Sequence, residues 1–451
     1  AIGASIFASN IGSEHLIGLA GAGASSGMAM AHWEIQGWMI LILGWVFVPF
    51  YTRSMVYTMP EFLERRYNPQ SRTILSVISL VSYVLTKVAV TVYAGGLVFQ
   101  QVFGIKELWG IDFFWIAAIG LVVLTALYTI FGGMKSVLYT SVLQTPILLL
   151  GSLIILVLGF KELGGWDEMM RVCGAVTVND YGDTMTNLIR SNDDANFPWL
   201  GALIGSAIIG FWYWCTDQFI VQRVLSGKNE MEARRGTIFG AYLKLLPVFL
   251  FLIPGMIAFA LHQKYIGAGG EGFLPMLENG TANADAAFPT LVAKLLPAGV
   301  KGLVVCGILA ALMSSLASLF NSSAMLFTID FYKRFRPQTS EKKLVGIGQV
   351  ATVVIVILGI LWIPIMRSVG DVLYTYLQDV QSVLAPGIAA AFLLGICWKR
   401  TSAQGGMWGL ISGMVIGLTR LGAKVYYSNA GEVADSTFKY LFYDMNWLFF
   451  C

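Results

Sequence analysis

Apolar stretches long enough to cross a bilayer recur about eleven times along the chain, at roughly 20 residues per membrane-spanning helix. We place them at 1–24, 30–52, 71–103, 112–131, 136–160, 198–222, 234–262, 299–331, 342–366, 371–397 and 403–427. A twelfth span is expected to begin near Phe438. The pattern predicts an all-α polytopic membrane protein.

Polar residues interrupt the first of these spans. The segment Ala8–His15, ASNIGSEH, places an amide, two hydroxyls, a carboxylate and an imidazole between two apolar stretches. Backbone that leaves the helix at membrane depth is tolerated only where it is buried in protein or lines a cavity. We therefore interpret the break as a site, with carbonyls for a cation and side chains for a polar solute. The alternative is an ordinary turn between helices, softened by Gly12.

Basic residues predict the orientation of the spans. They follow the second, sixth, eighth and tenth spans: Arg53, Arg65, Arg66 and Arg72; Arg223, Lys228, Arg234 and Arg235; Lys333, Arg334, Arg336, Lys342 and Lys343; Lys399 and Arg400. Because basic residues are retained on the cytoplasmic side, the ends of the even-numbered spans are predicted to be cytoplasmic. The two long opposite loops, 161–197 and 263–288, are then external.

Spans one to five and six to ten start on opposite faces, which is the condition for an inverted repeat. We predict a first repeat at 1–160, an external loop at 161–197, a second repeat at 198–400 and additional C-terminal helices at 401–451. In such a repeat the first helix of each half is broken. The sixth span fits, because Gly210 precedes an aromatic run that ends at Asp217.

Composition narrows the class of protein further. Hydrophobic residues make up 57% of the 451 residues and charged residues only 12%, which excludes an ordinary soluble enzyme. The net charge of +3, without a basic run interleaved with aromatics, argues against nucleic acid as a partner. The five cysteines have neither a disulfide nor a zinc spacing. No phosphate loop, HExxH motif or hydrolase elbow is present, so we expect no enzyme activity. The chain opens inside an apolar stretch without Met, and we expect flanking helices outside it.

Motifs in at least six spans resemble the sodium/solute symporters, and among them the sodium–glucose cotransporter branch. They are Asn10-Ile11-Gly12-Ser13, Tyr213-Trp214-Cys215-Thr216-Asp217-Gln218, Val221-Gln222-Arg223-Val224-Leu225-Ser226, Gly240-Ala241-Tyr242-Leu243-Lys244-Leu245-Leu246-Pro247 and Leu312-Met313-Ser314-Ser315-Leu316. The resemblance runs from the first residue to about Thr419. It implies a LeuT-type 5+5 inverted repeat with discontinuous first and sixth helices, sodium-coupled uptake by alternating access, and a multi-pass location in the plasma membrane, or the inner membrane if the source is bacterial.

A sodium ion is the cation that this resemblance implies. Sodium is a hard ion that prefers oxygen ligands, and Ser314 and Ser315 can supply hydroxyls. Carried over from the family, the ligands are the carbonyls of Ala8, Ile11 and Ala311 and the hydroxyls of Ser314 and Ser315. The alternative for the two serines is a hydrogen bond to their own helix, which is common in membranes.

Ionisable and amide side chains inside the spans suggest the solute. Glu34, Lys244 and Gln378 lie in the second, seventh and tenth spans, where polar groups are costly and usually functional. With Asn10 and His15 they form a set of donors and acceptors of mixed sign, which suits the hydroxyls of a small neutral sugar. A site for an anionic solute would be expected to contain more basic than acidic side chains. Glu34 and Lys244 could instead be a structural ion pair.

The resemblance also assigns roles to these residues. It places Glu34, His15, Lys244 and Gln378 at positions that contact the sugar. It places Tyr213 under the sugar ring as the inner gate, held by Asn10, with Trp214 beside it. The alternative is that these aromatics only pack at helical spacing. Lys87, Asp217, Asp371 and Asp379 also lie in or beside spans and receive no role.

The sequence thus predicts a sodium symporter for a neutral hexose, glucose or galactose. We expect one sodium per sugar, because Ser141 and Ala317 stand where a second sodium site of some family members would want an Asp and a threonine. The same family also suggests myo-inositol, sialic acid or a carboxylate as the solute. A membrane sensor that binds sugar without net flux is the alternative from another class.

Overall fold

The structure, a computed structural model, describes residues 2–12, 14–56, 58–277, 280–369, 373–429 and 436–451. The side chains of 8, 9, 128, 130–145, 366–369, 373–375, 429 and 447 lie outside the description. Almost every element is helical, as the hydropathy pattern predicts.

Short 3₁₀ or π turns, labelled η, join many of the helices. The elements of the first half are α1 (Ile2–Asn10), η1 (Glu14–Leu19), α2 (Ala20–Ser26), η2 (Gly27–Met30), α3 (Ala31–Ile35), α4 (Trp38–Ile42), η3 (Leu43–Phe47), α5 (Val48–Ser54), α6 (Met59–Arg66), α7 (Pro69–Ser82), η4 (Tyr83–Val88), α8 (Ala89–Phe103), the hairpin β1 (Glu107–Leu108) and β2 (Ile111–Asp112), α9 (Phe113–Leu163) and α10 (Trp166–Gly174).

The second half begins at the sixth span. Its elements are α11 (Trp199–Phe211), η5 (Trp212–Thr216), α12 (Gln218–Leu225), α13 (Glu230–Leu243), η6 (Val248–Leu252), α14 (Ile253–Gly267), η7 (Ala284–Ala286), α15 (Ala287–Leu295), α16 (Ala298–Met325), η8 (Leu326–Tyr332), α17 (Lys333–Phe335), α18 (Glu341–Val369), α19 (Leu373–Cys397), α20 (Ala403–Asn429), α21 (Thr437–Lys439), η9 (Tyr440–Asp444) and α22 (Trp447–Phe450).

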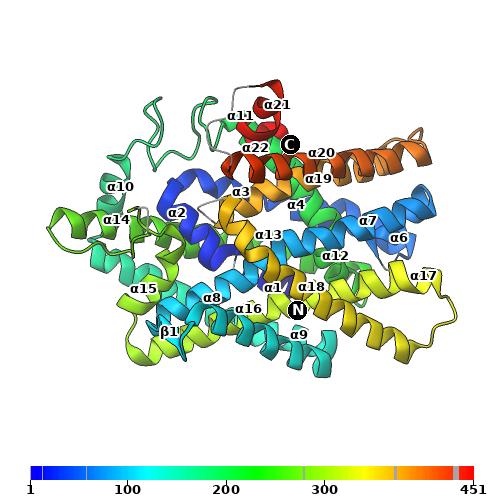
Figure 1. Ribbon diagram of the computed structural model, residues 1–451, viewed down its shortest axis with the longest axis horizontal. Coiled ribbons are helices and arrows are strands. Elements are labelled where there is room, and N and C mark those ends of the chain that lie inside the picture. The colour runs from blue at the N-terminus through cyan, green and yellow to red at the C-terminus, as the bar shows by residue number, and fades with distance from the viewer. Residues whose placement is uncertain (1, 13, 57, 278–279, 370–372, 430–435) are drawn as a thin grey trace.

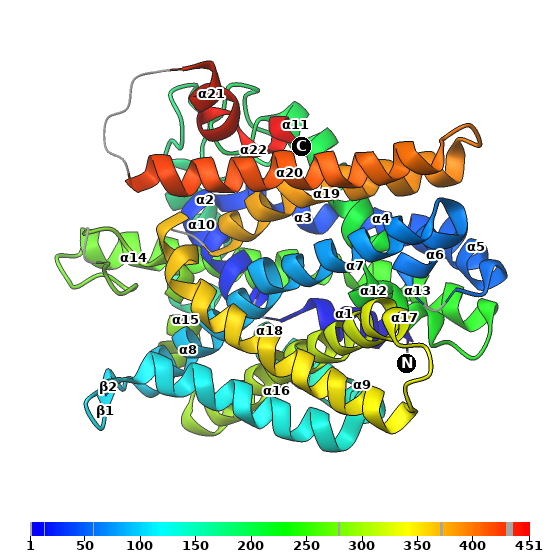
Figure 2. The same ribbon diagram turned by 45° about the vertical axis from the view of Figure 1, so that its right-hand side comes forward.

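The broken first helix lies inside the bundle. Figures 1 and 2 show α1 and α2 near the middle, α19 and α20 side by side along one edge, and α9 with α16 along the opposite edge. α1 packs against α13 and α16, while α2 packs against α14. Residues of the break are therefore surrounded by protein, and Ile11 and Leu16 are fully buried. This is the environment in which irregular backbone is tolerated at membrane depth.

Both predicted helix breaks are present. In the first, the Gly12 amide donates to the Asn10 carbonyl at 3.0 Å, and the His15 amide donates to the Gly12 carbonyl at 3.2 Å. In the second, Asp217 has an extended backbone, with φ −75° and ψ 126°. Its side chain accepts a hydrogen bond from the Phe219 amide and so caps α12. A capping carboxylate satisfies a helix-start amide that has no partner within the helix.

Most of the predicted spans coincide with helices. Eight segments of the described chain are long and apolar enough to cross a membrane: Glu14–Ser54, Pro69–Phe103, Pro146–Leu163, Trp199–Thr216, Glu230–Gly267, Ala298–Phe335, Glu341–Ile365 and Tyr376–Cys397. The count is lower than the eleven predicted spans for identifiable reasons. The first predicted span is divided at Ser13 and the fourth at residues 128 and 130–145, which lie outside the description wholly or in their side chains, and α20 is not among the segments that qualify.

Three boundaries differ from the predictions. The spans predicted at 112–131 and 136–160 fall within the single helical element α9 rather than in two. The loop predicted at 263–288 is shortened at both ends, since α14 continues to Gly267 and α15 begins at Ala287. The helix predicted near Phe438 is three short pieces, interrupted where Met445 is extended. In the last two cases neighbouring elements decide the boundary: α15 packs on α14, and α22 packs on α11 and α19.

Candidate functional site

Lys244 is the centre of a buried polar cluster between the two halves of the chain. Its ammonium donates to Oδ1 of Asn10 at 2.6 Å and lies 2.7 Å from Oε2 of Glu34. It also lies 2.7 Å from Nε2 of His15, which itself is 3.2 Å from Oε1 of Glu34. Asn10, His15, Glu34 and Lys244 are all at most 5% exposed. Four residues from three predicted spans are thus brought together, and the charges of Glu34 and Lys244 neutralise each other.

Local backbone features let these side chains meet. Asn10 ends α1 where the first helix breaks, and His15 is the second residue of η1, on the other side of the break. Lys244 follows the last residue of α13 and reaches Glu34 by passing Gly37, between α3 and α4. A Cβ at position 37 would lie 2.7 Å from Cγ of Lys244. Glycine is therefore needed at this position for the lysine to pass.

One side of the cluster is aromatic. Nδ2 of Asn10 donates to the Tyr213 hydroxyl at 3.0 Å, and the rings of Tyr213 and Trp214 meet edge to face with centroids 4.9 Å apart. The Lys87 ammonium lies 4.7 Å from the centre of the Tyr213 ring and 2.5 Å from Oδ2 of Asp217. Lys87 therefore ties η4 of the third span to the break of the sixth.

A small polar cavity adjoins the cluster at both helix breaks. Its lining residues are Asn10, Glu14, His15, Trp33, Gln36, Ile209, Gly210, Tyr213, Trp214, Lys244, Gln378 and Gln381. Six of the seven residues predicted to bind the solute are in this lining. The seventh, Glu34, does not line the cavity but contacts His15 and Lys244, which do. The free volume is about 30 Å³, which is room for about two water molecules and not for a sugar ring. A sugar can enter only if the elements around the cavity move apart.

The predicted sodium ligands lie at the first break and on α16. A Cβ at Gly12 would lie 2.6 Å from Oγ of Ser315, so the break and this hydroxyl are in direct contact. No amide of the described residues donates to the Ile11 carbonyl, since the His15 amide turns to Gly12 instead. Ser314 and Ser315 are buried, as is Ala311. Ala8 lies in α1 one turn before the break, and its side chain is not described.

The surroundings of the second possible sodium site are partly described. The side chain of Ser141 lies outside the described residues. Ser318 is described, and its hydroxyl donates to the Ser314 carbonyl at 2.8 Å and accepts a hydrogen bond from Arg223. Arg223 also donates to Oγ of Ser5 at 2.9 Å. The hydroxyl nearest to the serine pair is thus engaged by a fixed guanidinium.

The loop 161–197, which is predicted to be external, contacts the segment from Ser26 to His32. The Met28 amide donates to the Met185 carbonyl at 2.8 Å, Arg190 donates to the Ser26 carbonyl, and a ring nitrogen of His32 lies 2.8 Å from the Leu188 carbonyl. Within this loop the Asn179 side chain and the Ser191 amide donate to the Asp183 carboxylate and lower its pKa. The loop therefore packs against the end of α2, against η2 and against α3.

Sequence reasoning missed several residues of the cavity lining. Glu14, Trp33, Gln36 and Gln381 line it but were given no role. A signal existed for Gln381, because it is three residues after Gln378 and shares its helix face. No such signal marked Gln36, which faces the cavity because α3 ends at Ile35.

The residues without an assigned role have structural partners where they are described. Lys87 pairs with Asp217, and Asp379 pairs with Lys424 and lies 3.8 Å from Arg420. Asp371 lies outside the described residues.

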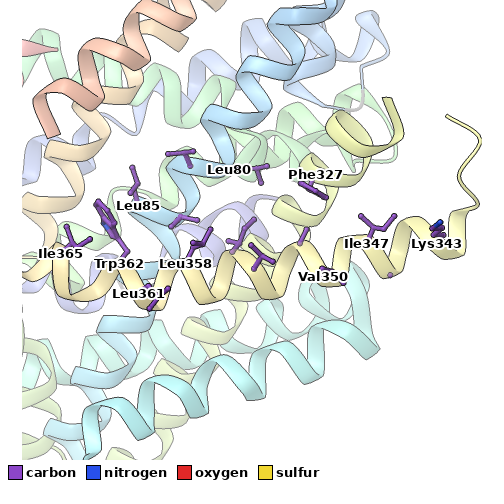
Figure 3. A pocket seen from close by; sticks show the side chains of 16 residues that line it. Leu80, Leu85, Phe327, Lys343, Ile347, Val350, Leu358, Leu361, Trp362 and Ile365 are labelled. Carbon is purple, nitrogen blue, oxygen red and sulfur yellow. The ribbon is translucent and has the colours of Figure 1, made fainter. Parts of the chain in front are cut away.

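The larger hollow of the molecule has a different character. Figure 3 shows a groove of about 780 Å³ along α18, lined by apolar side chains of α7, η4, η8 and α18 from Leu80 to Ile365, with Lys343 at one end. Val350 and Leu361 in this groove are 64% and 65% exposed. Such an apolar face suits lipid, and apart from Lys343 at its end its lining residues carry no charged group to orient a polar solute.

Comparisons with known proteins agree with this arrangement. Residues 1–413 match the family described as Sodium:solute symporter family. The sodium/myo-inositol cotransporter 2 of Homo sapiens is 39% identical over 433 residues, which cover 93% of this chain and 63% of that protein. The sodium/glucose cotransporter 1 of Ovis aries is 39% identical over 478 residues, which cover 100% of this chain and 69% of that protein. The chain thus spans less than two thirds of the length of the myo-inositol relative.

Two solved structures show the fold. A Na+-coupled sialic acid symporter in a substrate-bound outward-open state has a TM-score of 0.73 at 22% identity, covering 95% of this chain and 85% of that one. A nucleobase-cation-symport-1 family transporter in a closed conformation has a TM-score of 0.51 at 14% identity, covering 95% and 92%. With the eight candidate spans, these similarities confirm the predicted LeuT-type fold and a multi-pass membrane protein.

Proposed function

Because this chain belongs to the sodium:solute symporter family, we propose that it is a sodium-coupled symporter of a small neutral polyhydroxylated solute. The predicted hexose, glucose or galactose, remains our first candidate. The observation that carries the proposal is the polar cavity where the two broken helices meet, with Lys244 neutralised by Glu34 beside it. Such a site offers donors and acceptors without an excess of positive charge, and hydroxyls both donate and accept.

The cation has a separate place in this proposal. Sodium would be held by the carbonyls of Ala8, Ile11 and Ala311 and the hydroxyls of Ser314 and Ser315. The contact between Gly12 and Ser315 supports this, because a cation there would hold α1 against α16. Fixing the break also fixes Asn10 and His15, which lie on its two sides and line the cavity. Sodium would thereby favour the conformation that binds the solute, which is the differential binding that coupling requires.

Alternating access follows from the closed geometry. The cavity holds about 30 Å³, so the solute enters and leaves only in conformations that open one side. We propose Tyr213 as the inner gate, held by its hydrogen bond from Asn10, and the external loop 161–197 as part of the outer cover. The two repeats that move against each other would be 1–160 and 198–400. The membrane would be the plasma membrane, or the inner membrane of a bacterium.

A cyclitol is the second candidate solute. The relative named sodium/myo-inositol cotransporter 2 is as similar in sequence as the glucose cotransporter, at 39% identity each. A ring that carries a hydroxyl on every carbon would use the same donors and acceptors as a hexose.

Sodium-driven uptake into proteoliposomes tests the proposal. Radiolabelled galactose, glucose and myo-inositol are offered separately, under an inward sodium gradient and under a matched potassium gradient. We expect transient accumulation of at least one solute above its external concentration with sodium only. Equal uptake in both gradients would contradict sodium coupling. Binding of the solute to the purified protein without any flux would favour the sensor.

A further inference from the structure

The apolar groove along α18 lies apart from the polar cavity, with which it shares no lining residue. One wall is α18, and the other is formed by α7, η4 and η8 (Figure 3). At about 1.5 Å per residue, the distance along α18 from Lys343 to Ile365 is about 33 Å, close to the thickness of the hydrocarbon core of a bilayer. The candidate span Glu341–Ile365 covers the same stretch. The groove therefore follows the helix across the membrane.

The groove is a concave surface on one side of α18. Val350 and Val354 line it from this helix, and Phe327 lines it from η8. Gly346 widens it, because a Cβ there would meet no atom within 4 Å. Val353, on the same helix, is 51% exposed but lies outside the lining. The volume of about 780 Å³ is in the range of ligand pockets, about 300–1,000 Å³, and the apolar lining suits a hydrocarbon chain.

The groove carries a charge at one end. Lys343 is the one charged residue among the described residues that line it. Toward the other end, the indole nitrogen of Trp362 donates to the Tyr376 hydroxyl at 2.6 Å, and this hydroxyl donates to the Leu85 carbonyl at 3.0 Å. The polar groups there are therefore already engaged. A ligand that fits this distribution has a charged head and a long apolar tail.

The charge at the head end is positive and lacks a counter-charge. Lys343 and Arg334 form no ion pair with a carboxylate of the described residues. Arg334 donates to the Pro69 carbonyl and to the Thr73 hydroxyl. These contacts hold its guanidinium at the start of α7, which forms part of the opposite wall. Two unmatched positive charges thus lie at the ends of elements that form the groove.

The segment that contains these two residues is strongly basic. From Lys333 to Lys343 it has five basic residues and one acidic residue, Glu341. Glu341 lines a different hollow, between α9, α16, η8 and α18. The segment is predicted to be cytoplasmic, and clusters of Lys and Arg directly beside a span attract anionic lipids of the cytoplasmic leaflet. A zwitterionic headgroup carries its own ammonium and would leave the cluster without a counter-charge.

We propose that the groove binds an anionic phospholipid of the cytoplasmic leaflet, with its phosphate at Lys343 and Arg334 and one acyl chain along α18. One leaflet contributes about half of the hydrocarbon core, about 15 Å, which corresponds to about ten residues of α18. The acyl chain then extends to about Val354. The lipid bridges α7 and α18 and so stabilises the packing of the third span on the ninth. This site does not depend on which solute the protein carries.

Thermal unfolding of the purified full chain in detergent, titrated with phosphatidylglycerol or phosphatidylcholine of the same acyl chains, tests the headgroup. We expect phosphatidylglycerol to raise the unfolding temperature saturably, at a concentration at least about fivefold lower than phosphatidylcholine requires. Lys343→Gln should weaken this effect about fivefold and Lys343→Glu about tenfold or more. Lys399→Glu, at an exposed lysine after the tenth span, is the matched control and should leave it unchanged.

Val354→Trp tests the acyl chain. An indole at this position fills the groove, whereas Val353→Trp adds the same ring to the same helix outside the groove. The two valines are matched, at 49% and 51% exposure. We expect Val354→Trp to weaken binding of phosphatidylglycerol at least about fivefold and Val353→Trp to leave it unchanged. Without added lipid, both variants should unfold at the temperature of the wild type.

Four results would overturn the proposal. Equal effects of the two lipids on the wild type would exclude selection of an anionic headgroup. An equal loss in Lys343→Glu and Lys399→Glu would show only a general attraction between basic residues and the membrane. Equal binding by the two tryptophan variants would exclude an acyl chain in the groove. A photoreactive amino acid in place of Val350 that cross-links to another polypeptide instead of lipid would show that a protein covers the groove.

Discussion

Glu34 and Gln378 show how differently two buried polar residues can be placed in one site. Glu34 is fully buried and forms an ion pair with Lys244 at 2.7 Å. Gln378 is also buried, but its Oε1 accepts no hydrogen bond from the described residues and lines the cavity. Glu34 therefore stabilises the fold through its ion pair in addition to any contact with a solute. The Oε1 of Gln378 makes no such stabilising contact with the described residues.

This difference predicts two separable phenotypes. Glu34→Gln should lower both solute affinity and unfolding temperature, because breaking a buried ion pair costs about 3–5 kcal/mol. Gln378→Ala should weaken solute binding by about 1–3 kcal/mol and leave the unfolding temperature nearly unchanged. Thermal unfolding and equilibrium binding of the purified variants measure both effects. As a control, Glu34→Gln combined with Lys244→Met should recover stability but not binding. Unchanged affinity in both single variants would remove these residues from the site.

Tyr213 is the residue whose hydroxyl and ring can be tested apart. Tyr213→Ala should retain sodium binding but lose most coupled uptake, because the inner gate loses its ring. Tyr213→Phe removes only the hydrogen bond from Asn10, which contributes about 0.5–1.5 kcal/mol, and should cost less. Sodium-dependent uptake, with sodium binding measured in parallel, gives the answer. Transport at the wild-type rate by Tyr213→Ala would show that the gate assignment is wrong.

The residue types predicted which side chains belong to the site but not which of them contact one another. Asn10, His15, Lys244, Tyr213 and Gln378 were predictable because polar groups are rare in apolar spans. Their mutual contacts were not, since Lys244 meets Asn10 across 234 positions of the chain. Glu14 was visible as a carboxylate in the break, but its exclusion from the ion pairs depends on where Lys87 and Lys244 point.

The proposed cation site depends on the broken first helix. Gly12 lies against Oγ of Ser315, and a Cβ there would approach it to 2.6 Å. Gly12→Ala should therefore push α1 away from α16 and raise the half-saturating sodium concentration about tenfold or more, equivalent to about 1.4 kcal/mol. Gly302→Ala, in α16 with no atom within 4 Å of the added methyl group, is the matched control. Sodium titration of solute binding measures both. Equal sodium dependence in the two variants would contradict a cation site at the break.

The broken sixth helix depends on the pair between Lys87 and Asp217. Asp217 accepts hydrogen bonds from Tyr83, Lys87 and the Phe219 amide, at 2.7, 2.5 and 3.0 Å. Asp217→Asn leaves the buried ammonium without its counter-charge and should lower stability by about 3–5 kcal/mol. The double variant with Lys87→Met should recover part of this loss. Thermal unfolding in detergent measures the stability of the three variants. If the double variant lost as much stability as the two single variants together, Lys87 and Asp217 would not be coupled.

Helix breaks were predictable from sequence where polar residues caused them. Ala8–His15 and Gly210–Asp217 stand out from apolar surroundings, and both breaks are observed. The interruptions at η3 and η6 lie in wholly apolar sequence, LGWVF and VFLFL, and no polar signal marks them. The short helix α15 was not predicted because it is too short to stand out as a membrane span. Its residues are buried because it packs on α8 and α14.

At the scale of the whole molecule, the proposed cation site and the proposed solute site must both respond to one conformational change. The proposed cation site lies between α1 and α16, and the cavity proposed for the solute lies at both helix breaks. Asn10 belongs to both, because it ends α1 and also bonds Tyr213 and Lys244. Coupling between two ligands is a reciprocal free energy. Sodium should therefore lower the dissociation constant of the solute by the same factor by which the solute lowers that of sodium.

The expected stoichiometry of one sodium per solute is also a property of the whole molecule. Ser318 is engaged by Arg223 and by its own helix, and Ser141 offers no anionic ligand. A second dehydrated cation would thus lack a carboxylate and a free hydroxyl, and the cost of leaving a charge without such partners is high. One positive charge should then cross the membrane with each neutral solute molecule.

Reversal potentials measured in proteoliposomes test this account most directly, because they require sodium coupling and report its ratio. With one net charge per solute molecule, a tenfold change in the solute gradient should shift the reversal potential by about 59 mV, and the same should hold for a tenfold change in the sodium gradient. Two sodium ions per solute would give about 30 mV for the solute and would contradict the single site. A reversal potential that does not respond to sodium would contradict sodium-coupled symport itself.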